Sequence, residues 1–199
     1  MLAANLETAI NALWDVQLKH GAKLTVIGAG ALGCLCAWLA HSQFDADVEL
    51  IDINEGRAAT AEHLGVCFAT PARARADVPV VIHTSATQDG LQTSLELGGF
   101  EATILELSWF GDKEPRVPLG AAFHSKRLTL KASQVGHVAA PMRGHASRSS
   151  RLQTALRLLR EPSLDVLIDS QSRFSELPDV LAALANGSRS AICHRVHYD

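Results

Sequence analysis

Three glycines at an expected strand-to-helix turn have the spacing of a phosphate-binding loop. Gly28, Gly30 and Gly33 lie in the segment GAGALG, which follows the apolar run 24–27 and precedes a long apolar stretch. The first glycine permits a tight turn, the second lets a phosphate approach the backbone, and the third lets the helix pack closely on the sheet. This pattern predicts a site for the pyrophosphate of a dinucleotide.

The amides that follow the turn supply the expected binding groups. Ala31 and Leu32 begin the helix, so their N–H groups have no partner within it and would face the phosphates. The helix dipole adds partial positive charge there, and no lysine is needed. A glycine-rich turn used only for packing is the structural alternative.

An acid follows the second expected strand at the spacing of a ribose-binding residue. Asp52 comes 19 residues after Gly33, at the C-terminal end of the expected strand 47–53, where its carboxylate could accept hydrogen bonds from the adenosine ribose. A 2′-phosphate would meet this charge at close range. The nearest cation, Arg57, is expected one helical turn further on. The arrangement favours NAD over NADP.

Composition predicts one compact domain in a reducing compartment. The chain has 199 residues, of which 47% are hydrophobic and 20% charged, and its net charge of −3 makes a broad nucleic-acid surface unexpected. Cys34 and Cys36 point in different directions from one helix, and Cys67 and Cys193 are isolated, so no disulfide framework is expected. With no signal peptide and no membrane-spanning run, the chain is expected to be cytoplasmic.

Alternating strands and helices predict an α/β fold of the Rossmann type, with a doubly wound, mainly parallel six-stranded sheet. We expect strands at 24–27, 47–53, 66–69, 79–84, 102–110 and 128–135, and intervening helices at 31–40, 55–64 and 89–97. An irregular connection leads to the last strand, which is expected at the sheet edge. Its unpaired backbone groups predict a homodimer through 128–135.

Both ends of the chain carry further elements. A leading helix is expected from Asn5, and the tail is expected to contain a helix at 147–160, a strand at 166–168, a helix at 177–185 and a strand at 191–196. Two arrangements remain open for the apolar faces of the tail: they pack on the sheet, or they meet a domain outside this chain.

Taken together, several segments resemble the medium-chain dehydrogenase/reductase family, and specifically the C-terminal half of its zinc-type alcohol dehydrogenase relatives. The resemblance spans almost the whole chain and rests on the segments NLETAINALWD, VIGAGALG, VELIDIN, VVIHTSA, LELGGFEATILELSWFG, FHSKRLTLKASQVG, LPDVLAALANG and ICHRVHYD. The FHSKRLTLKASQVG segment is similar to a branch that includes bacteriochlorophyllide-type and uncharacterised zinc-binding dehydrogenases.

The resemblance implies a cofactor domain that normally follows an N-terminal catalytic domain carrying the zinc ligands. It divides the chain into a leading inter-domain helix (1–20), an NAD-binding domain (21–144) and a tail (145–199) that returns to the catalytic domain. The outer apolar faces of the leading helix and the tail are then expected to be exposed or covered by another chain. Zinc is expected only in the missing domain, so this chain alone is expected to be inactive.

The resemblance also implies roles for individual residues. Thr84, Ser85 and Ala86 would line the path between adenine and nicotinamide, and Ser108 and Trp109 would lie near the nicotinamide. The full set of expected cofactor-binding residues is Gly28, Gly30, Ala31, Leu32, Gly33, Asp52, Ile53, Arg57, Thr84, Ser85, Ala86, Ser108 and Trp109. Many relatives have a glycine and then an apolar residue at 108 and 109, so the larger side chains narrow the expected ring pocket.

Histidines and serines offer weaker candidates. His83 stands where the family often has an acid, and a hydrogen-bonded structural role is favoured over an acid–base role. His194 and His197 lie three apart in an expected strand and therefore point to opposite faces, which makes a poor ligand pair. Neither Ser85 nor Ser108 has a base at a recognisable spacing, so nucleophilic catalysis has no support. No metal site is expected in this chain.

A basic stretch surrounds the expected tail helix. We expect these arginines to form a solvated helix face, which is favoured over an anion-binding or nucleic-acid-binding site. They are Arg143, Arg148, Arg151, Arg157 and Arg160.

Three functions remain in view. The first is the NAD(H)-binding domain of an alcohol dehydrogenase-like oxidoreductase, which transfers a hydride between nicotinamide and an alcohol or carbonyl. The second is a non-catalytic dinucleotide-binding or regulatory module. The third is an S-adenosylmethionine-dependent methyltransferase, because such enzymes also place a glycine loop and an acid on a doubly wound sheet.

Overall fold

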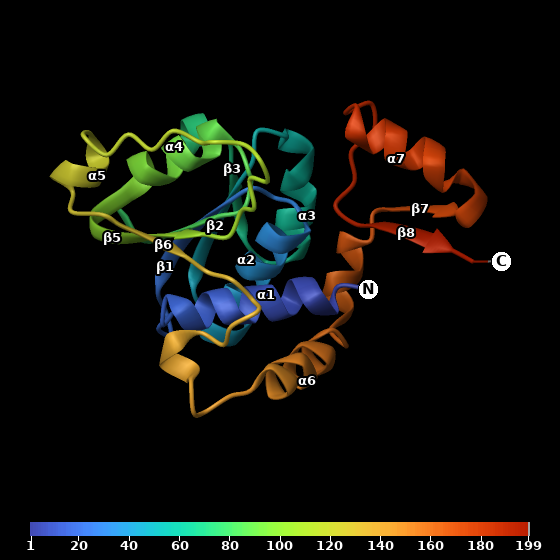
Figure 1. Cartoon of the computed structure of the whole chain (residues 1–199), viewed down its shortest axis with the longest axis horizontal. Helices are drawn as coiled ribbons and strands as arrows, with labels where there is room; N and C mark the ends of the chain where they lie inside the picture. The colour runs from blue at the N-terminus through green and yellow to red at the C-terminus, as the bar shows by residue number, and fades with distance from the viewer. Residues whose placement is uncertain (199) are drawn as a thin grey trace.

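A computed structural model describes residues 1–198 and contains a six-stranded sheet in which every neighbouring pair is parallel (Figure 1). The strand order is β3-β2-β1-β4-β5-β6. The order reverses between β1 and β4, which is where open α/β sheets bind ligands. The predicted fold class is confirmed. The strands are β1 (Lys23–Ile27), β2 (Asp47–Ile51), β3 (Cys67–Ala69), β4 (Val78–His83), β5 (Gly98–Glu106) and β6 (Thr129–Ala132).

Helices cover both faces of the sheet. One face carries α1 (Ala3–Asp15), α2 (Ala31–Phe44), α3 (Ala58–His63) and α6 (Arg148–Leu158), and the other carries α4 (Gln88–Leu97) and α5 (Ala122–Ser125). Successive strand residues feed opposite cores, as the two-residue period of a strand requires. Val26 and Leu50 belong to the first core, which lies on the face that carries α1 and α2. Ile27 and Ile51 belong to the second core, on the face that carries α4 and α5.

The fifth strand begins and ends earlier than the predicted 102–110. Gly98 follows α4 directly and already pairs with Val78, after which the register shifts so that Val80 pairs with Thr103. A Cβ on Gly99 would lie 3.0 Å from the backbone of Asp77, so the close approach of these two backbone segments favours glycine there. The glycine pair therefore marks an irregular strand start as well as a helix end.

Smaller differences affect other boundaries. The predicted helix 55–64 is a 3₁₀ turn (Glu55–Arg57) followed by α3, and the edge strand β6 is shorter than the predicted 128–135. Further 3₁₀ turns lie at Pro71–Arg73 and Ala140–Met142. None of the described helices is long and apolar enough to cross a membrane.

In the tail, the predicted strand 166–168 is wrong. That segment belongs mainly to a 3₁₀ helix (Pro162–Leu167), in which Leu164 and Leu167 are buried in the first core. A short apolar run cannot be distinguished from a buried helical turn by its pattern alone, and a proline at the first helical position favours the turn.

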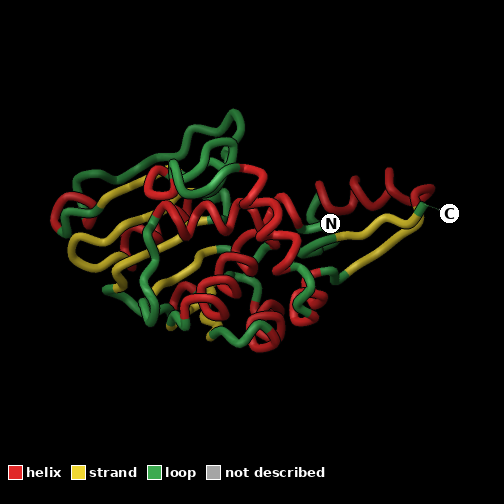
Figure 2. The backbone as a smooth tube through the Cα atoms, turned by 90° about the horizontal axis from the view of Figure 1, so that it is seen from below, coloured by secondary structure: helices red, strands yellow, loops and turns green. Residues whose placement is uncertain are grey.

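The strand–helix–strand order of the tail is nevertheless present. It consists of β7 (Ser170–Arg173), the 3₁₀ turn Phe174–Glu176, α7 (Leu177–Ala185) and β8 (His194–His197), with the two strands parallel. This tail unit projects from the main body as a small lobe (Figure 2).

A buried arginine joins α6 to α1. Arg151 is 2% exposed, and its guanidinium donates to Glu7 at 3.2 Å, to Asn11 Oδ1 at 2.6 Å and to the carbonyl of Val135 at 2.6 Å. The predicted solvated role is therefore wrong for Arg151. Its contacts are satisfied within the chain, as a buried charge requires.

The apolar faces of the two ends differ. The leading helix buries Leu6, Ile10 and Leu13 inside this chain, so the exposed apolar face expected for it is not found. In the tail, Leu156 of α6 is 52% exposed and Leu181 of α7 is 56% exposed, in line with the expectation for that region.

Candidate functional site

Two of the three glycines are required by the fold itself. Gly28 has a φ of +102°, and a Cβ there would lie 2.9 Å from both the Ser85 amide nitrogen and Thr84 Oγ1. A Cβ on Gly33 would overlap the carbonyl oxygen of Gly28. These contacts bring the turn after β1, the first turn of α2 and the end of β4 together.

Gly30 is different, because nothing in the fold demands a glycine there. Its φ of −80° suits any residue, and a Cβ would meet no described atom within 4 Å. Gly30 is the N-cap of α2, and no described side chain caps that end of the helix. The backbone is therefore open to solvent where the amides of Ala31 and Leu32 lack helical partners.

The carboxylate of Asp52 is tied to the same turn. The Ala29 amide donates to Asp52 Oδ2 at 2.7 Å, and the Asn54 amide donates to Oδ1 at 2.8 Å. Each carboxylate oxygen can accept a further hydrogen bond, so the group can still take a hydroxyl donor. Beside it, Ile53 is 86% exposed and presents an apolar surface at the end of β2.

Arg57 does not contact Asp52 in the structure. Its guanidinium lies 3.3 Å from Asp169 Oδ2 and donates to Ser190 Oγ at 2.9 Å, and both of these residues belong to the tail. Arg57 and Asp169 are more than a hundred positions apart in the sequence, so no local sequence pattern predicts this contact.

The segment after β4 meets the end of β5 at the point where the strand order reverses. The Thr84 hydroxyl donates toward the carbonyl oxygens of Ile27 and Gly28, at 2.9 and 3.0 Å. The Ala86 amide donates to Ser108 Oγ at 3.0 Å, which joins the two segments that were expected to line the cofactor path. Thr84, Ser85 and Ala86 follow β4, and Ser108 and Trp109 follow β5. These five expected site residues therefore lie at the same edge of the sheet as Gly28 and Asp52, which follow β1 and β2.

Beneath them lies a hydrogen-bonded chain that sequence reasoning missed. His83 is fully buried, with Nδ1 2.7 Å from Glu106 Oε2 and Nε2 2.7 Å from Ser85 Oγ. The expectation that Ser85 lacks a paired base is therefore wrong. The sequence could have indicated this contact in part, because His83 and Glu106 are the last residues of β4 and β5 and pair with each other. The predicted fifth strand ended four residues later, which hid the pairing.

The environment of the Ser85 hydroxyl indicates a structural role. Its Oγ lies 2.9 Å from Thr87 Oγ1, and a Cβ on Gly90 would overlap it, so the hydroxyl faces the first turn of α4. The chain from Glu106 through His83 to Ser85 therefore orders the loop after β4, which agrees with the structural reading of His83.

The site is an open surface in this chain. Trp109 is 89% exposed in the loop after β5, and Phe110 turns back to place its ring centroid 6.1 Å from that of His83. Hollows in the described surface lie beside β6, in the tail and between α1, α2 and α6.

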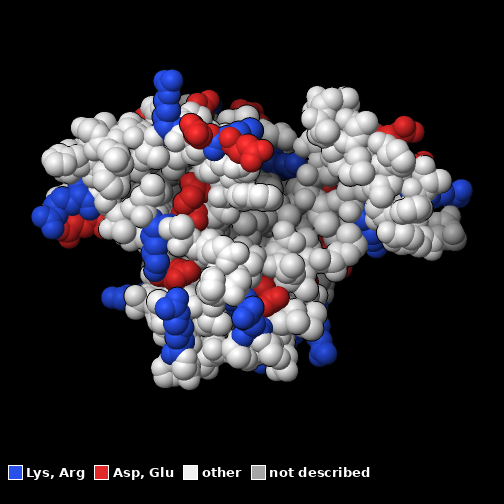
Figure 3. Space-filling view, in the orientation of Figure 1, with Lys and Arg blue, Asp and Glu red and all other residues white. Residues whose placement is uncertain are grey.

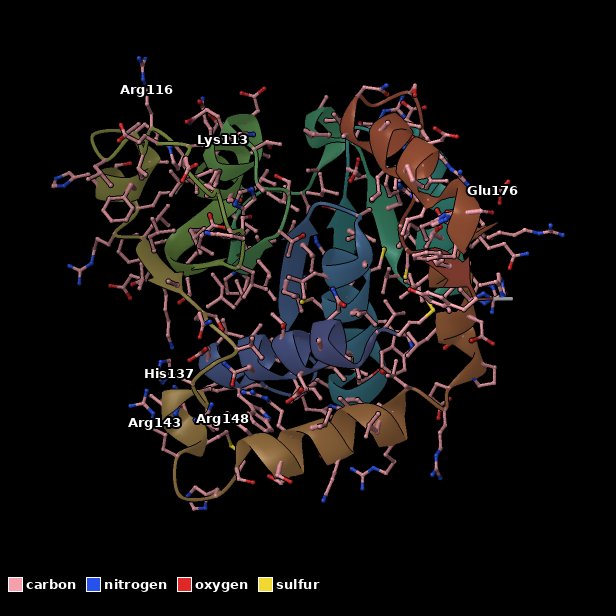
Figure 4. All side chains as sticks on the ribbon, turned by 45° about the vertical axis from the view of Figure 1, so that its right-hand side comes forward. Lys113, Arg116, His137, Arg143, Arg148 and Glu176 are labelled. Atoms are coloured by element: carbon pink, nitrogen blue, oxygen red, sulfur yellow. The ribbon has the colours of Figure 1, made fainter. Side chains whose placement is uncertain are left out.

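On the face of the molecule shown in Figure 3, charges do not gather into one basic area. Acidic and basic side chains alternate over the face shown in Figure 3. His137, Arg143 and Arg148 lie around the segment that leads into α6, whereas Lys113 and Arg116 lie apart from them on the loop after β5 (Figure 4).

The histidines of β8 bind different partners. His194 contacts Ser170 and Ser172 at 2.8 and 2.9 Å, and His197 contacts Gln171 at 3.0 Å, so the two rings lie on opposite faces of the strand pair. Within residues 1–198, no group of three or more His, Cys, Asp or Glu side chains is arranged to hold a metal ion.

Proteins similar to this chain include dehydrogenases. No family model matches the chain. An uncharacterised zinc-type alcohol dehydrogenase-like protein of Haemophilus influenzae is 25% identical over 201 residues, which cover 93% of this chain and 54% of that protein. The chain matches the C-terminal half of the zinc-type alcohol dehydrogenases. It spans about half the length of this curated relative.

Solved dehydrogenase structures share the fold. Galactitol-1-phosphate dehydrogenase from Escherichia coli superposes with a TM-score of 0.78 at 18% identity, covering 96% of this chain and 57% of that one. Acetophenone reductase from Geotrichum candidum, solved in complex with NAD, superposes with a TM-score of 0.73 at 16% identity, covering 94% and 52%. The fold of this chain is that of an alcohol dehydrogenase-like oxidoreductase and accounts for about half of these proteins.

Proposed function

We propose that this chain is the NAD(H)-binding part of an alcohol dehydrogenase-like oxidoreductase. The contrast among the three glycines carries the proposal. Packing accounts for Gly28 and Gly33, but it gives no reason for a glycine at Gly30, where the helix amides face open space. A ligand that approaches the backbone closely, such as a pyrophosphate, supplies that reason.

In this proposal each residue has a binding role. The amides of Ala31 and Leu32 hold the pyrophosphate beside Gly30, and Asp52 accepts from the hydroxyls of the adenosine ribose. Ile53 offers its exposed side chain to the adenine. The proposal extends to the loops after β4 and β5, where Thr84, Ser85, Ala86, Ser108 and Trp109 flank the nicotinamide end.

The chemistry comes from the cofactor, since nicotinamide accepts or donates the hydride. The residues described here bind it and fix its orientation. They do not fit a catalytic zinc site, because no suitable ligand group occurs among residues 1–198. We assign the polarisation of the alcohol or carbonyl to the N-terminal catalytic domain that the family resemblance implies, and the segment 145–199 to contacts with it.

The sheet edge supports a proposed homodimer. In the described part of the chain β6 pairs only with β5, so its outer backbone groups are open to a second copy. The four free cysteines are consistent with a reducing cytoplasm.

Titration calorimetry tests the proposal directly. NADH is expected to bind the purified chain and S-adenosylmethionine is not. Asp52→Ala is expected to weaken NADH binding by about tenfold, a loss in the range of a charge-assisted hydrogen bond. Glu55→Gln, which alters an exposed carboxylate on the next turn, is the matched control and should bind as the wild type does.

Other outcomes separate the rival functions. Binding of S-adenosylmethionine without NADH would favour a methyltransferase and overturn the proposal. NADH binding with no turnover, even after a catalytic domain is supplied in trans, would favour a regulatory module. Turnover of an alcohol by residues 1–199 alone would contradict the assignment of catalysis to another domain.

A further inference from the structure

Arg57, which follows the end of β2, contacts the tail of the chain. Arg57 follows the expected ribose acid by five residues, yet its guanidinium contacts Asp169 at 3.3 Å and Ser190 at 2.9 Å. The Arg57 side chain is only 14% exposed and that of Asp169 is 29% exposed, so the pair is partly shielded from solvent.

Asp169 has little freedom to move away. The Ile192 amide donates to both of its carboxylate oxygens, at 3.0 and 2.9 Å, and the Cys193 amide lies 3.3 Å from Oδ1. Asp169 lies between the 3₁₀ helix Pro162–Leu167 and β7, and its partners Ile192 and Cys193 directly precede β8. Its position is therefore fixed by the segments that lead into both strands of the tail.

The charges of this region also act on one buried thiol. Burial raises the pKa of Cys34 in the first turns of α2 to about 12, and the charges of Arg57, Asp52 and Asp169 make smaller contributions. Arg57 lies in the 3₁₀ turn that follows Asp52 and Asn54 at the end of β2, so the Arg57–Asp169 pair lies at the same end of this strand as Asp52.

We propose that Asp169 is a specificity-determining residue that selects NAD(H) over NADP(H). Resting on the function proposed above, this inference assigns two effects to its carboxylate. It engages Arg57, the cation best placed to bind a 2′-phosphate, and it adds a second negative charge to that of Asp52. An arginine already paired with a carboxylate has fewer free donors for a phosphate.

The effect is a difference between two affinities, so its size is modest. Partly exposed ion pairs contribute little individually, and we expect removal of the Asp169 charge to change the NADPH-to-NADH affinity ratio by about fivefold. Most of that change should appear as tighter NADPH binding, because NADH has no 2′-phosphate for Arg57 to bind.

Titrations of both dinucleotides with matched variants test this inference. In Asp169→Asn the NADPH-to-NADH affinity ratio is expected to rise about fivefold. Asp165→Asn removes the same charge four residues away, from a carboxylate without a partner among the described residues, and should leave the ratio unchanged. In an Arg57→Gln background, Asp169→Asn should shift the ratio by less than about twofold, since the freed cation is then absent.

The results separate the inference from the proposed function. If the wild-type chain binds neither dinucleotide, the proposed function fails. If NADH binds but Asp169→Asn leaves the ratio unchanged, or Asp165→Asn shifts it equally, the specificity role is overturned. Should Asp169→Asn not fold, Asp169→Ser also removes the charge while keeping an oxygen that can accept a hydrogen bond, and it must raise the ratio in the same direction, or the inference is overturned as well.

Discussion

At the glycine turn, three identical residues meet different physical demands. Gly28 has a backbone conformation that side chains rarely adopt, and Gly33 lies against a carbonyl oxygen, so both are fixed by the protein's own atoms. Gly30 lies against open space. Residue type alone does not reveal this difference, which depends on what surrounds each Cβ position.

The cysteines provide a test at the residue scale. Burial raises the pKa of Cys34 to about 12, so at pH 8 roughly one molecule in ten thousand carries the thiolate there. Cys67 is exposed. We expect iodoacetamide at pH 8 to alkylate Cys67 and to leave Cys34 unmodified, as followed by peptide mass spectrometry.

The denatured chain is the control for this experiment, because both thiols should then react. Alkylation of Cys34 in the folded chain at a rate comparable to that of Cys67 would show that the thiol is not buried beneath the turn.

Single residues also show where sequence reasoning stops. The spacing of Gly28, Gly33 and Asp52 was sufficient to predict that they lie together, because a strand, a turn and a helix fix local geometry. The contact between Arg57 and Asp169 depends on how a distant tail folds back. No local pattern encodes that contact.

At the scale of elements, continuously apolar segments were predicted well, and segments interrupted by glycine or proline were not. The strand before the glycine turn and the helix after it have continuous apolar patterns. β1 lies within one residue of its expected bounds, and α2 begins at the expected residue but continues to Phe44, beyond the expected 31–40. The start of β5 was missed because Gly98 and Gly99 usually end structure, whereas here they allow two backbones to approach. In the tail, the apolar run near Leu167 was predicted as a strand but forms a buried 3₁₀ turn. Three apolar residues are too few to show whether the period is that of a strand or of a helix.

The packing of α6 on α1 depends on one buried arginine. Arg151→Ala is expected to lower the free energy of unfolding by about 3 kcal/mol, because the Glu7 carboxylate and the Asn11 amide oxygen lose their partner. Urea denaturation followed by circular dichroism measures this change.

Arg157→Ala on the same helix is the matched control. Arg157 is exposed, so its replacement should change stability by less than about 0.5 kcal/mol. Equal losses for the two variants would mean that the buried network does not hold the helices together.

At the scale of the whole molecule, the sheet edge and the tail are the regions where we expect contacts with other chains or domains. The tail unit extends beyond the main body and exposes Phe174 and Tyr198, whose rings stack at 5.0 Å. The fold class was predictable because the strand–helix alternation runs through the whole sheet. The arrangement of the tail was not, because its short elements pair with each other and with distant loops.

The edge strand β6 leads to a prediction about assembly. Light scattering at micromolar concentration is expected to give a mass near twice the 21.3 kDa of one chain, because a second copy can pair with the open backbone of β6. A monomer under these conditions would mean that the edge is protected in another way.

The most direct test of the central claim is NADH titration of Gly30→Val, with Gly120→Val as the control. Neither position has a described atom within 4 Å of its Cβ or a positive φ, so both variants should fold, with a stability change of at most about 1 kcal/mol for Gly30→Val. We expect Gly30→Val to lose at least about tenfold in NADH affinity, a cost of about 1.4 kcal/mol, while Gly120→Val binds as the wild type does. Unchanged NADH binding by Gly30→Val would contradict the claim that a pyrophosphate lies against this turn.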